Sequence, residues 1–274
     1  MTFERDMYLR QQADLLRFGV RTVADVEVEP ITLEAARQHL RVDVYDIDDP
    51  ESEASPPDQL TISDDDAWIE AMLPAAREYC EQYLGRALAP RTLEYVGNAF
   101  PTVALGDPPG PAFELPMGPV QSIASITYDD QAVADAAYTE AYDAEFLISG
   151  DVELATAAGE AAAAAALSVT VPADDYAVDA ISVPSRALLT YGSTWPVARS
   201  STGSVRVRYV TGYSVPGESP QVHVLPKMAR AAILLMLGHL YENREAVAIG
   251  NLVEIPLGVH ALLDLLPRER LGVA

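Results

Sequence analysis

The sequence REYCEQYLGR at residues 77–86 closes one helical segment, and the sequence GHLYENRE at residues 238–245 lies in a second, which spans residues 226–247. Each helix is apolar over more of its circumference than one exposed helix can keep in water. We therefore expect these two helices, far apart in the chain, to pack on each other. The residues between them alternate in the manner of β-strands and would form an insertion.

This arrangement predicts an α+β fold. Its base would be a bundle of about four helices drawn from both ends of the chain, and it would carry an inserted antiparallel β domain. The expected organisation is an N-terminal arm at 1–30, a helical bundle at 31–90 and 222–267, a β-rich domain at 91–221, and a C-terminal tail at 268–274.

The charge of the chain is strongly unbalanced. Its 274 residues include 41 acidic and 18 basic ones, which gives a formal net charge of −23. A surface this negative repels phosphate backbones, so DNA binding through basic contacts is not expected. The charge is compatible with a protein that surrounds DNA without binding it.

Neither a disulfide framework nor a membrane segment is expected. Cys80 is the only cysteine, and its place on an apolar helical stripe predicts a packed thiol. Residues 1–10 are charged and lack the apolar core of a secretory signal. The apolar run at 231–238 is far shorter than the ~20 residues that cross a bilayer. We expect a soluble protein with no membrane partner.

Helix signals mark five segments. Residues 3–19 form an amphipathic pattern that ends at Gly19, and Thr32 is a good N-cap for the next helix. A longer helix is predicted to start at Ser63 and to end at Gly85, with a kink caused by Pro74. The two others are expected at 226–247 and at about 257–266.

An acidic segment precedes the second main helix. Residues 43–66 contain ten acidic residues and no basic one, together with three prolines. This composition is typical of a solvated loop, and the functional alternative is an acidic surface facing nucleic acid or a basic partner. The candidate residues for that channel or loop surface are Asp46, Asp48, Asp49 and Glu51.

Short alternating segments between the helices predict an antiparallel sheet or sandwich. Residues 154–167 are almost all alanine with one glycine, and they fit a short helix or an ordered loop equally well. The expected strands lie at 92–95, 112–115, 122–128, 146–149, 168–171, 187–191 and 205–209.

No motif for catalysis, for a cofactor or for a metal is recognised, so we expect no enzyme, and neither a cofactor nor a metal. His239 and Glu242 lie three residues apart on a helix, a spacing that suits metal ligands, although a structural hydrogen bond is the simpler interpretation. The acid pairs 129–130 and 174–175 fall at expected turns, and a glycosidase carboxylate pair is the alternative. Trp195 is either a ligand platform or an anchor that packs the β domain against its helical base.

Six segments, in order, resemble the head–tail connector (head-completion or adaptor) family of tailed bacteriophages. Together they cover nearly all of residues 31–267. They are ITLEAARQHLRVD at 31–43, AAREYCEQYLGRAL at 75–88, YGSTWP at 191–196, VRVRYVTGY at 205–213, AILLMLGHLYENREAV at 232–247 and IPLGVHALLDLLP at 255–267.

The resemblance implies a structural virion protein made in the host bacterial cytoplasm and located in the neck, at the head–tail junction. Twelve copies would form a ring under the portal protein, above the next neck or tail protein (a stopper or tail terminator), with DNA passing through the lumen without specific binding. Leu237, Tyr241, Arg244 and Glu245 are then candidates for the subunit interface. The candidates for portal docking are Leu265, Leu266, Arg268 and Arg270.

Three departures from the family pattern stand out: residues 1–29 extend beyond its usual start, the acidic loop is longer, and residues 136–175 enlarge the β insertion. The alternatives are a different neck or tail-completion protein and, from another class, a carbohydrate-binding or glycoside-hydrolase-like module. Loss of glycan binding on Trp195→Ala would favour the second alternative.

Overall fold

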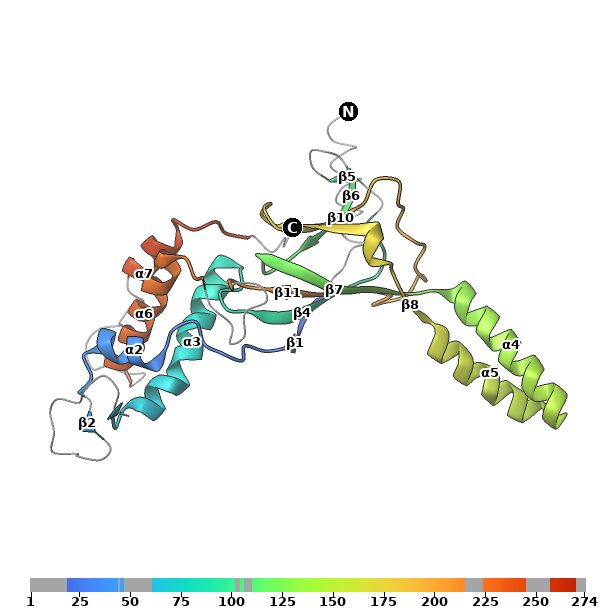
Figure 1. Cartoon of the computed structure of the whole chain (residues 1–274), viewed down its shortest axis with the longest axis horizontal. Coiled ribbons are helices and arrows are strands. Elements are labelled where there is room, and N and C mark those ends of the chain that lie inside the picture. The colour runs from blue at the N-terminus through green and yellow to red at the C-terminus, as the bar shows by residue number, and fades with distance from the viewer. Residues whose placement is uncertain are drawn as a thin grey trace. The chain divides into compact units, whose positions relative to one another are not determined.

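The computed structural model divides the chain into two compact units, each assembled from two separate stretches (Figure 1). The β unit comprises Met1–Asp25 and Arg91–Thr211, and the helical unit comprises Val26–Pro90 and Gly212–Ala274. The predicted α+β fold with an inserted antiparallel β domain is confirmed. The structure describes residues 19–43, 45–46, 61–101, 104–105, 110–214, 224–244 and 257–269.

The helical unit has one apolar core, to which α3 and α6 contribute the longest faces. Ile69, Leu73 and Cys80 of α3 pack with Ile233 and Leu237 of α6, so the expected contact between these two distant segments is confirmed. The helices of this unit are α2 (Leu33–Leu40), α3 (Asp66–Leu84), α6 (Lys227–Glu242) and α7 (Leu257–Leu263), and β2 (Tyr45–Asp46) pairs with β3 (Thr61–Ile62).

Some helix ends of this unit follow the sequence signals and others do not: α6 ends at Glu242 and α7 at Leu263, before the expected 247 and 266. Thr32 caps α2, since its hydroxyl accepts a hydrogen bond from Ala35 N–H at 3.2 Å. Helix α3 begins at Asp66 rather than at Ser63, because Ser63 stands in the turn before the helix and donates its N–H to the Asp66 carboxylate at 2.8 Å. Helix α3 continues across Pro74, and the kink there stays a prediction.

The β unit is built on two antiparallel sheets that share one core. The five-stranded sheet has the order β1-β4-β11-β7-β8, and the four-stranded sheet has the order β5-β6-β10-β9. The strands are β1 (Gly19–Ala24), β4 (Arg91–Gly97), β5 (Ala104–Leu105), β6 (Gly110–Leu115), β7 (Val120–Asp129), β8 (Ser168–Thr170), β9 (Tyr176–Asp179), β10 (Ser185–Leu189) and β11 (Val205–Thr211), with a 3₁₀ turn at Ala173–Asp175.

Strand β11 lies at the centre of the five-stranded sheet and shows the predicted alternation. Val205, Val207 and Tyr209 are fully buried in the shared core, and Arg206 and Arg208 lie on the opposite face. The Tyr209 hydroxyl donates to the carbonyl oxygen of Pro116 at 2.7 Å, which satisfies its buried polar group. The sequence pattern therefore set both the strand and its inward face.

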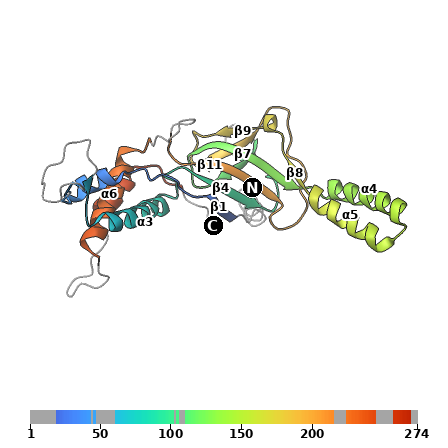
Figure 2. The same cartoon turned by 60° about the horizontal axis from the view of Figure 1, so that its bottom comes forward.

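An antiparallel helical hairpin, formed by α4 (Gln131–Ser149) and α5 (Val152–Ala166), interrupts the strands between β7 and β8 (Figure 2). The open alternative at 154–167 is settled as helix. The predicted strand at 146–149 is wrong, because these residues form the last turn of α4. Asp130 caps α4, and Gly150 ends it in a left-handed conformation with φ +67°.

Residues 19–24 form strand β1, which pairs with β4 along one edge of the five-stranded sheet. The sequence suggested only an arm here, with Gly19 as a helix stop, whereas Gly19 is the first residue of the strand. The helix expected at 3–19 lies outside the described residues, apart from Gly19.

Candidate subunit and partner interfaces

The side chains considered as a metal ligand or a reactive group are held by hydrogen bonding or packing within the fold. His239 Nδ1 lies 3.3 Å from Asn243 Nδ2, at the end of α6. Cys80 is fully buried, and desolvation raises the pKa of its thiol to about 12, so it is inert at neutral pH. Over the part of the chain that the structure describes, no three His, Cys, Asp or Glu residues gather as a metal site would require, and no helix is both long and apolar enough to cross a membrane.

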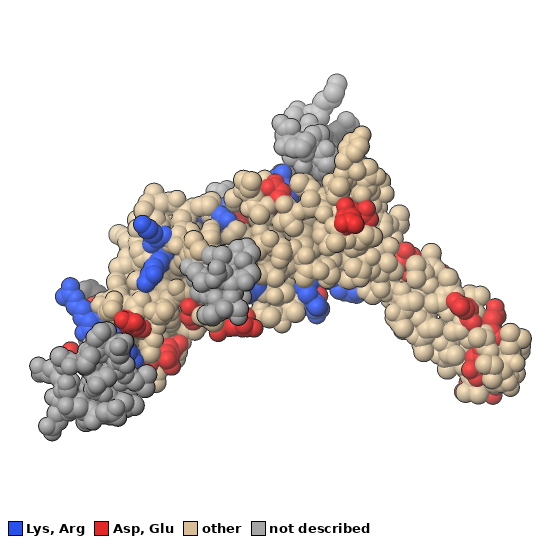
Figure 3. All heavy atoms as spheres, viewed as in Figure 1, with Lys and Arg blue, Asp and Glu red and all other residues tan. Residues whose placement is uncertain are grey.

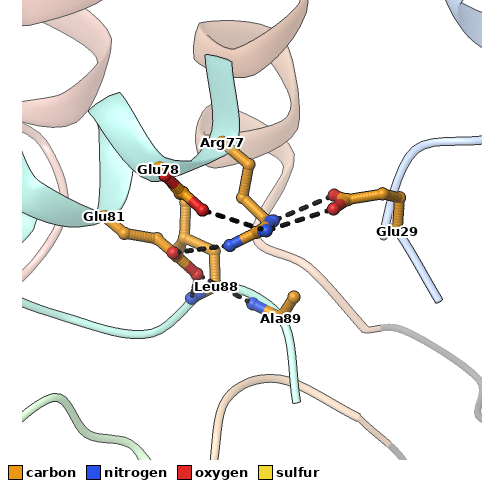
Figure 4. A network of polar contacts seen from close by, with 6 residues as sticks. All are labelled: Glu29, Arg77, Glu78, Glu81, Leu88 and Ala89. Atoms are coloured by element: carbon orange, nitrogen blue, oxygen red, sulfur yellow. Dashed lines mark hydrogen bonds and ion pairs between the residues drawn. The ribbon is translucent and has the colours of Figure 1, made fainter. Parts of the chain in front are cut away.

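The motif AAREYCEQYLGRAL contains a buried ion network (Figure 4). Arg77 and Glu81 each expose only 2% of their surface, and the Arg77 guanidinium donates to Glu81 at 2.8 Å and to Glu29 at 2.9 Å. Glu81 also accepts hydrogen bonds from the N–H groups of Leu88 (2.7 Å) and Ala89 (3.2 Å). One carboxylate therefore fixes the turn that follows α3, and this motif serves the fold.

Gly85 in the same motif holds the C-terminal segment against the end of α3. Its φ is +66°, and a Cβ at this position would overlap the carbonyl oxygen of Glu269. The Glu269 N–H donates to the carbonyl of Leu84 at 2.9 Å, and the Glu269 carboxylate lies 3.5 Å from the Arg86 guanidinium. Only glycine gives both this backbone conformation and this approach.

Three of the candidate portal-docking residues lie in this segment: Leu265, Leu266 and Arg268. The guanidinium of Arg268 lies 3.8 Å from the ring centroid of Tyr83 and forms an ion pair with Asp264. Leu265 is exposed and Leu266 packs against the helical core. Arg268 is therefore already bound within its own subunit, and its docking role stays a prediction. Arg270 lies outside the described residues.

Two of the candidate subunit-interface residues, Tyr241 and Arg244, lie in a cluster where the N-terminus of α3 meets the C-terminus of α6. Arg244 lies over the rings of Trp68 (4.9 Å to the centroid) and Tyr241 (4.5 Å), and it donates to Asp65 at 2.6 Å. Tyr241 also donates its hydroxyl to Asp65. Arg244 and Tyr241 keep partial exposure, so an interface role stays a prediction.

The structure covers only part of the rest of the interface set and of the acidic set. Leu237 is fully buried in the helical core, so a role for it at an interface would have to act through the residues around it. Asp46 lies in β2. Glu245 and the acidic residues Asp48, Asp49 and Glu51 lie outside the described residues.

Trp195 packs within the β unit itself. Its ring stacks on Phe100 with a centroid distance of 5.2 Å and meets Phe113 edge-on at 5.2 Å. One ring face is therefore covered by a core aromatic, and Trp195 acts as an anchor inside the β sandwich. Three of the four residues in the acid pairs have structural partners: Asp129 pairs with Arg206, Asp130 caps α4, and Asp175 accepts from Ser193.

An acid-sensitive contact joins α2 to α3. Arg37 Nε donates to Asp66 at 2.7 Å, and this hydrogen bond is the main reason that the pKa of Asp66 is lowered. Because the folded pKa lies below the ordinary value of about 4, the ionised group stabilises the fold above that pH. The contribution is lost as pH falls through the folded pKa.

We expect Asp66→Asn to destabilise the helical unit at pH 6 and to cost progressively less as pH falls below about 4, where the carboxyl of the unfolded wild type takes up a proton before that of the folded state. Urea unfolding followed by Trp68 fluorescence at a series of pH values measures the difference. Glu70→Gln on the exposed face of α3 is the control. A difference that stays constant from pH 6 to pH 3 would contradict the assignment.

The architecture defined above is a helical bundle carrying an inserted antiparallel β sandwich, which itself carries a helical hairpin. No protein-family model and no curated protein matches the chain. Three solved structures share its fold, and each comparison covers 93% of this chain and 98% of the other.

Two of these structures are necks of gene transfer agent (GTA) particles. The neck of the empty particle, computed with C6 symmetry, gives 19% identity and a TM-score of 0.56, and the neck of the native particle, computed with C12 symmetry, gives 17% and 0.52. The third is the virion of the native particle, with 18% identity and a TM-score of 0.54. At these identities the likeness establishes a common fold.

Proposed function

We propose that this chain is the subunit of a head-to-tail adaptor ring in the neck of a phage-like particle. Twelve copies would join the portal protein to the next neck or tail protein and enclose the path of the DNA. One observation carries the proposal: the fold likeness extends over almost the whole of both chains, and those chains come from GTA particles, including a neck computed with C12 symmetry.

The surface of α6 supports assembly into a ring. Met228 and Leu235 lie seven residues apart on one face of this helix and remain 42% and 37% exposed, although α6 is among the most apolar elements of the helical unit. Such a face gains stability when another subunit covers it. In a cyclic ring the covering surface would be a different patch of the next copy.

The charge of the chain supports a channel through which DNA passes without binding to the wall. A net charge of −23 on each copy would repel the phosphate backbone over about one Debye length, which is ~8 Å at physiological ionic strength. DNA would then pass through the lumen without specific binding. The exposed Leu265 and the neighbouring Arg268 would face the portal.

Electron microscopy of particles that carry an N-terminally tagged chain tests this function. We expect the tag at the junction of head and tail and a ring with twelvefold symmetry in averaged images. Purified protein can stay monomeric without its template, so the particle is the informative sample.

The substitution Leu235→Ser is expected to reduce incorporation into the neck, and Ile181→Ser is the matched control, because Ile181 is 94% exposed in the β unit. A tag located on the capsid shell or at the tail tip would overturn the proposal. So would a neck that is complete in particles lacking this chain.

A further inference from the structure

The α4–α5 hairpin ends in an apolar surface that its own unit leaves uncovered. The two helices pack chiefly on each other through small residues, and the Tyr138 ring fills the space beside Gly159. At the closed end, Leu147 is 85% exposed and Ile148 is 82% exposed. This hairpin tip comprises Phe146, Leu147, Ile148, Val152 and Leu154, all at least 43% exposed. Contiguous exposed apolar surface of this kind marks a contact with a partner.

The charge around the tip restricts the choice of partner. Residues 130–167 contain eight acidic residues and no basic one, and Figure 3 shows acidic side chains gathered on the hairpin. Anionic membranes and nucleic acids would be repelled by these carboxylates. Two hairpin tips would also repel each other, since Glu145, Asp151 and Glu153 surround each one. The partner surface must therefore combine apolar and cationic side chains.

The outer face of the five-stranded sheet combines the two: a central charged row of Arg21, Glu94 and Arg208 lies between the row of Val96 and the row of Val210. Arg208 lies opposite Glu94 on β4, Arg21 lies opposite the same Glu94 from β1, and Arg206 lies opposite Val96. The side chains of Arg21 and Arg208 are 65% and 47% exposed, although both bind the Glu94 carboxylate. Two guanidinium groups on the Glu94 carboxylate leave one net positive charge, while Arg206 pairs with Asp129 and keeps 33% of its side chain exposed. The arginine face is defined by Arg21, Arg206 and Arg208 with the half-buried Val96 and Val210.

The hairpin helices do not pack on β1, β4 or β11 of their own copy. Helix α4 has 19 residues and therefore places the tip ~28 Å from the end of β7, at 1.5 Å per residue. The hairpin begins at β7 and returns at β8, on the edge of the same sheet. A contact between the two surfaces must join two copies, and a contact between unlike surfaces propagates into a ring or a filament.

We propose that the hairpin tip of one copy docks on the arginine face of a second copy of this chain. The apolar tip side chains cover Val96 and Val210, and the hairpin carboxylates face Arg21, Arg206 and Arg208. The contact rests on the proposed ring and deepens it, because it gives neighbouring subunits a second link through the β units.

A photo-crosslinker in place of Leu147 tests the contact in assembled particles. Benzoylphenylalanine at this exposed position should join two copies, and mass spectrometry should locate the crosslinked peptide at residues 92–96 or 205–210. A crosslink to any other protein, to another part of this chain, or to nothing would overturn the proposal.

Three full-length variants separate the contact from the ring itself. Leu147→Ser/Ile148→Ser and Arg208→Gln are each expected to lower the yield of complete rings at least tenfold, while Ile181→Ser leaves it unchanged. Arg208→Gln still leaves Glu94 paired with Arg21, so the sheet keeps its own ion pair. If both variants form twelvefold rings normally, the docking contact is contradicted, whereas the adaptor function is not. If the necks of wild-type particles contain no ring of this chain, the proposed adaptor function itself is refuted.

Discussion

Arg77→Met is expected to lower the free energy of unfolding of the helical unit by about 3–5 kcal/mol, the usual cost of removing one partner of a buried ion pair. Methionine keeps the apolar stem of the side chain but removes the guanidinium that binds Glu81 and Glu29. The Glu81 carboxylate, 2% exposed, would then remain buried without this cation. Its hydrogen bonds to Leu88 and Ala89 would weaken in turn.

The chain offers a local reporter for this measurement. Trp68 lies in the helical unit and Trp195 in the β unit, so a Trp195→Phe background follows the helical unit alone during urea unfolding. The control is Glu78→Gln, because Glu78 is 58% exposed and lies 3.9 Å from Arg77. We expect this control to cost less than about 0.5 kcal/mol.

A double variant tests the electrostatic cause. Arg77→Met/Glu81→Gln removes both charges and keeps a side-chain carbonyl that accepts from Leu88 and Ala89. Its destabilisation should be clearly smaller than the sum of the two single changes, since the interaction between them is counted twice in that sum. Simple additivity, or a loss below about 1 kcal/mol for Arg77→Met alone, would mean that the network does not hold the turn.

Gly85→Ala is expected to destabilise the helical unit by about 2–4 kcal/mol, from a left-handed backbone and a displaced hydrogen-bonded segment. The added Cβ would overlap the Glu269 carbonyl oxygen, so the segment that begins at Asp264 must move. That movement breaks the hydrogen bond from Glu269 N–H to Leu84. Carboxypeptidase should then shorten the chain faster than in the wild type, which mass spectrometry detects.

Gly150→Ala is the matched control for the backbone contribution. Its φ of +67° is almost the same as that of Gly85, but a Cβ there meets nothing within 4 Å. We expect it to cost about 1 kcal/mol in the hairpin and to leave the C-terminal segment protected. If thermal unfolding and digestion respond equally to both substitutions, steric overlap with Glu269 is not the reason for glycine at position 85.

The sequence predicted most elements well, and its failures have identifiable causes. The run Phe146-Leu147-Ile148 has the composition of a strand, but it is the last turn of a helix that Asp130 starts and Gly150 ends. The sequence contains both cap residues, but the prediction of a strand followed the apolar run. The structure leaves this run exposed, as the hairpin tip.

The contacts and exposure of the candidate interface residues were harder to predict, because both depend on partners that are far away in the sequence. Tyr241 and Arg244 lie on α6 or just beyond its end, yet they bind Asp65 and Trp68, 173 or more residues earlier in the chain. Arg268 likewise pairs within its own subunit. The buried Arg77–Glu81 pair had a detectable signal, an opposite charge four residues along an otherwise apolar helical stripe.

The sequence by itself determined what depends on local periodicity: the two apolar helices at 66–84 and 227–242, the alternating strand at 205–211 and the acidic balance of the chain. Only the tertiary structure decided what depends on contacts between distant segments. It placed Arg77 in a buried network, seated Trp195 inside the sandwich and left the hairpin tip uncovered. Burial and pairing are set by side chains far away in the chain, and no local pattern encodes them.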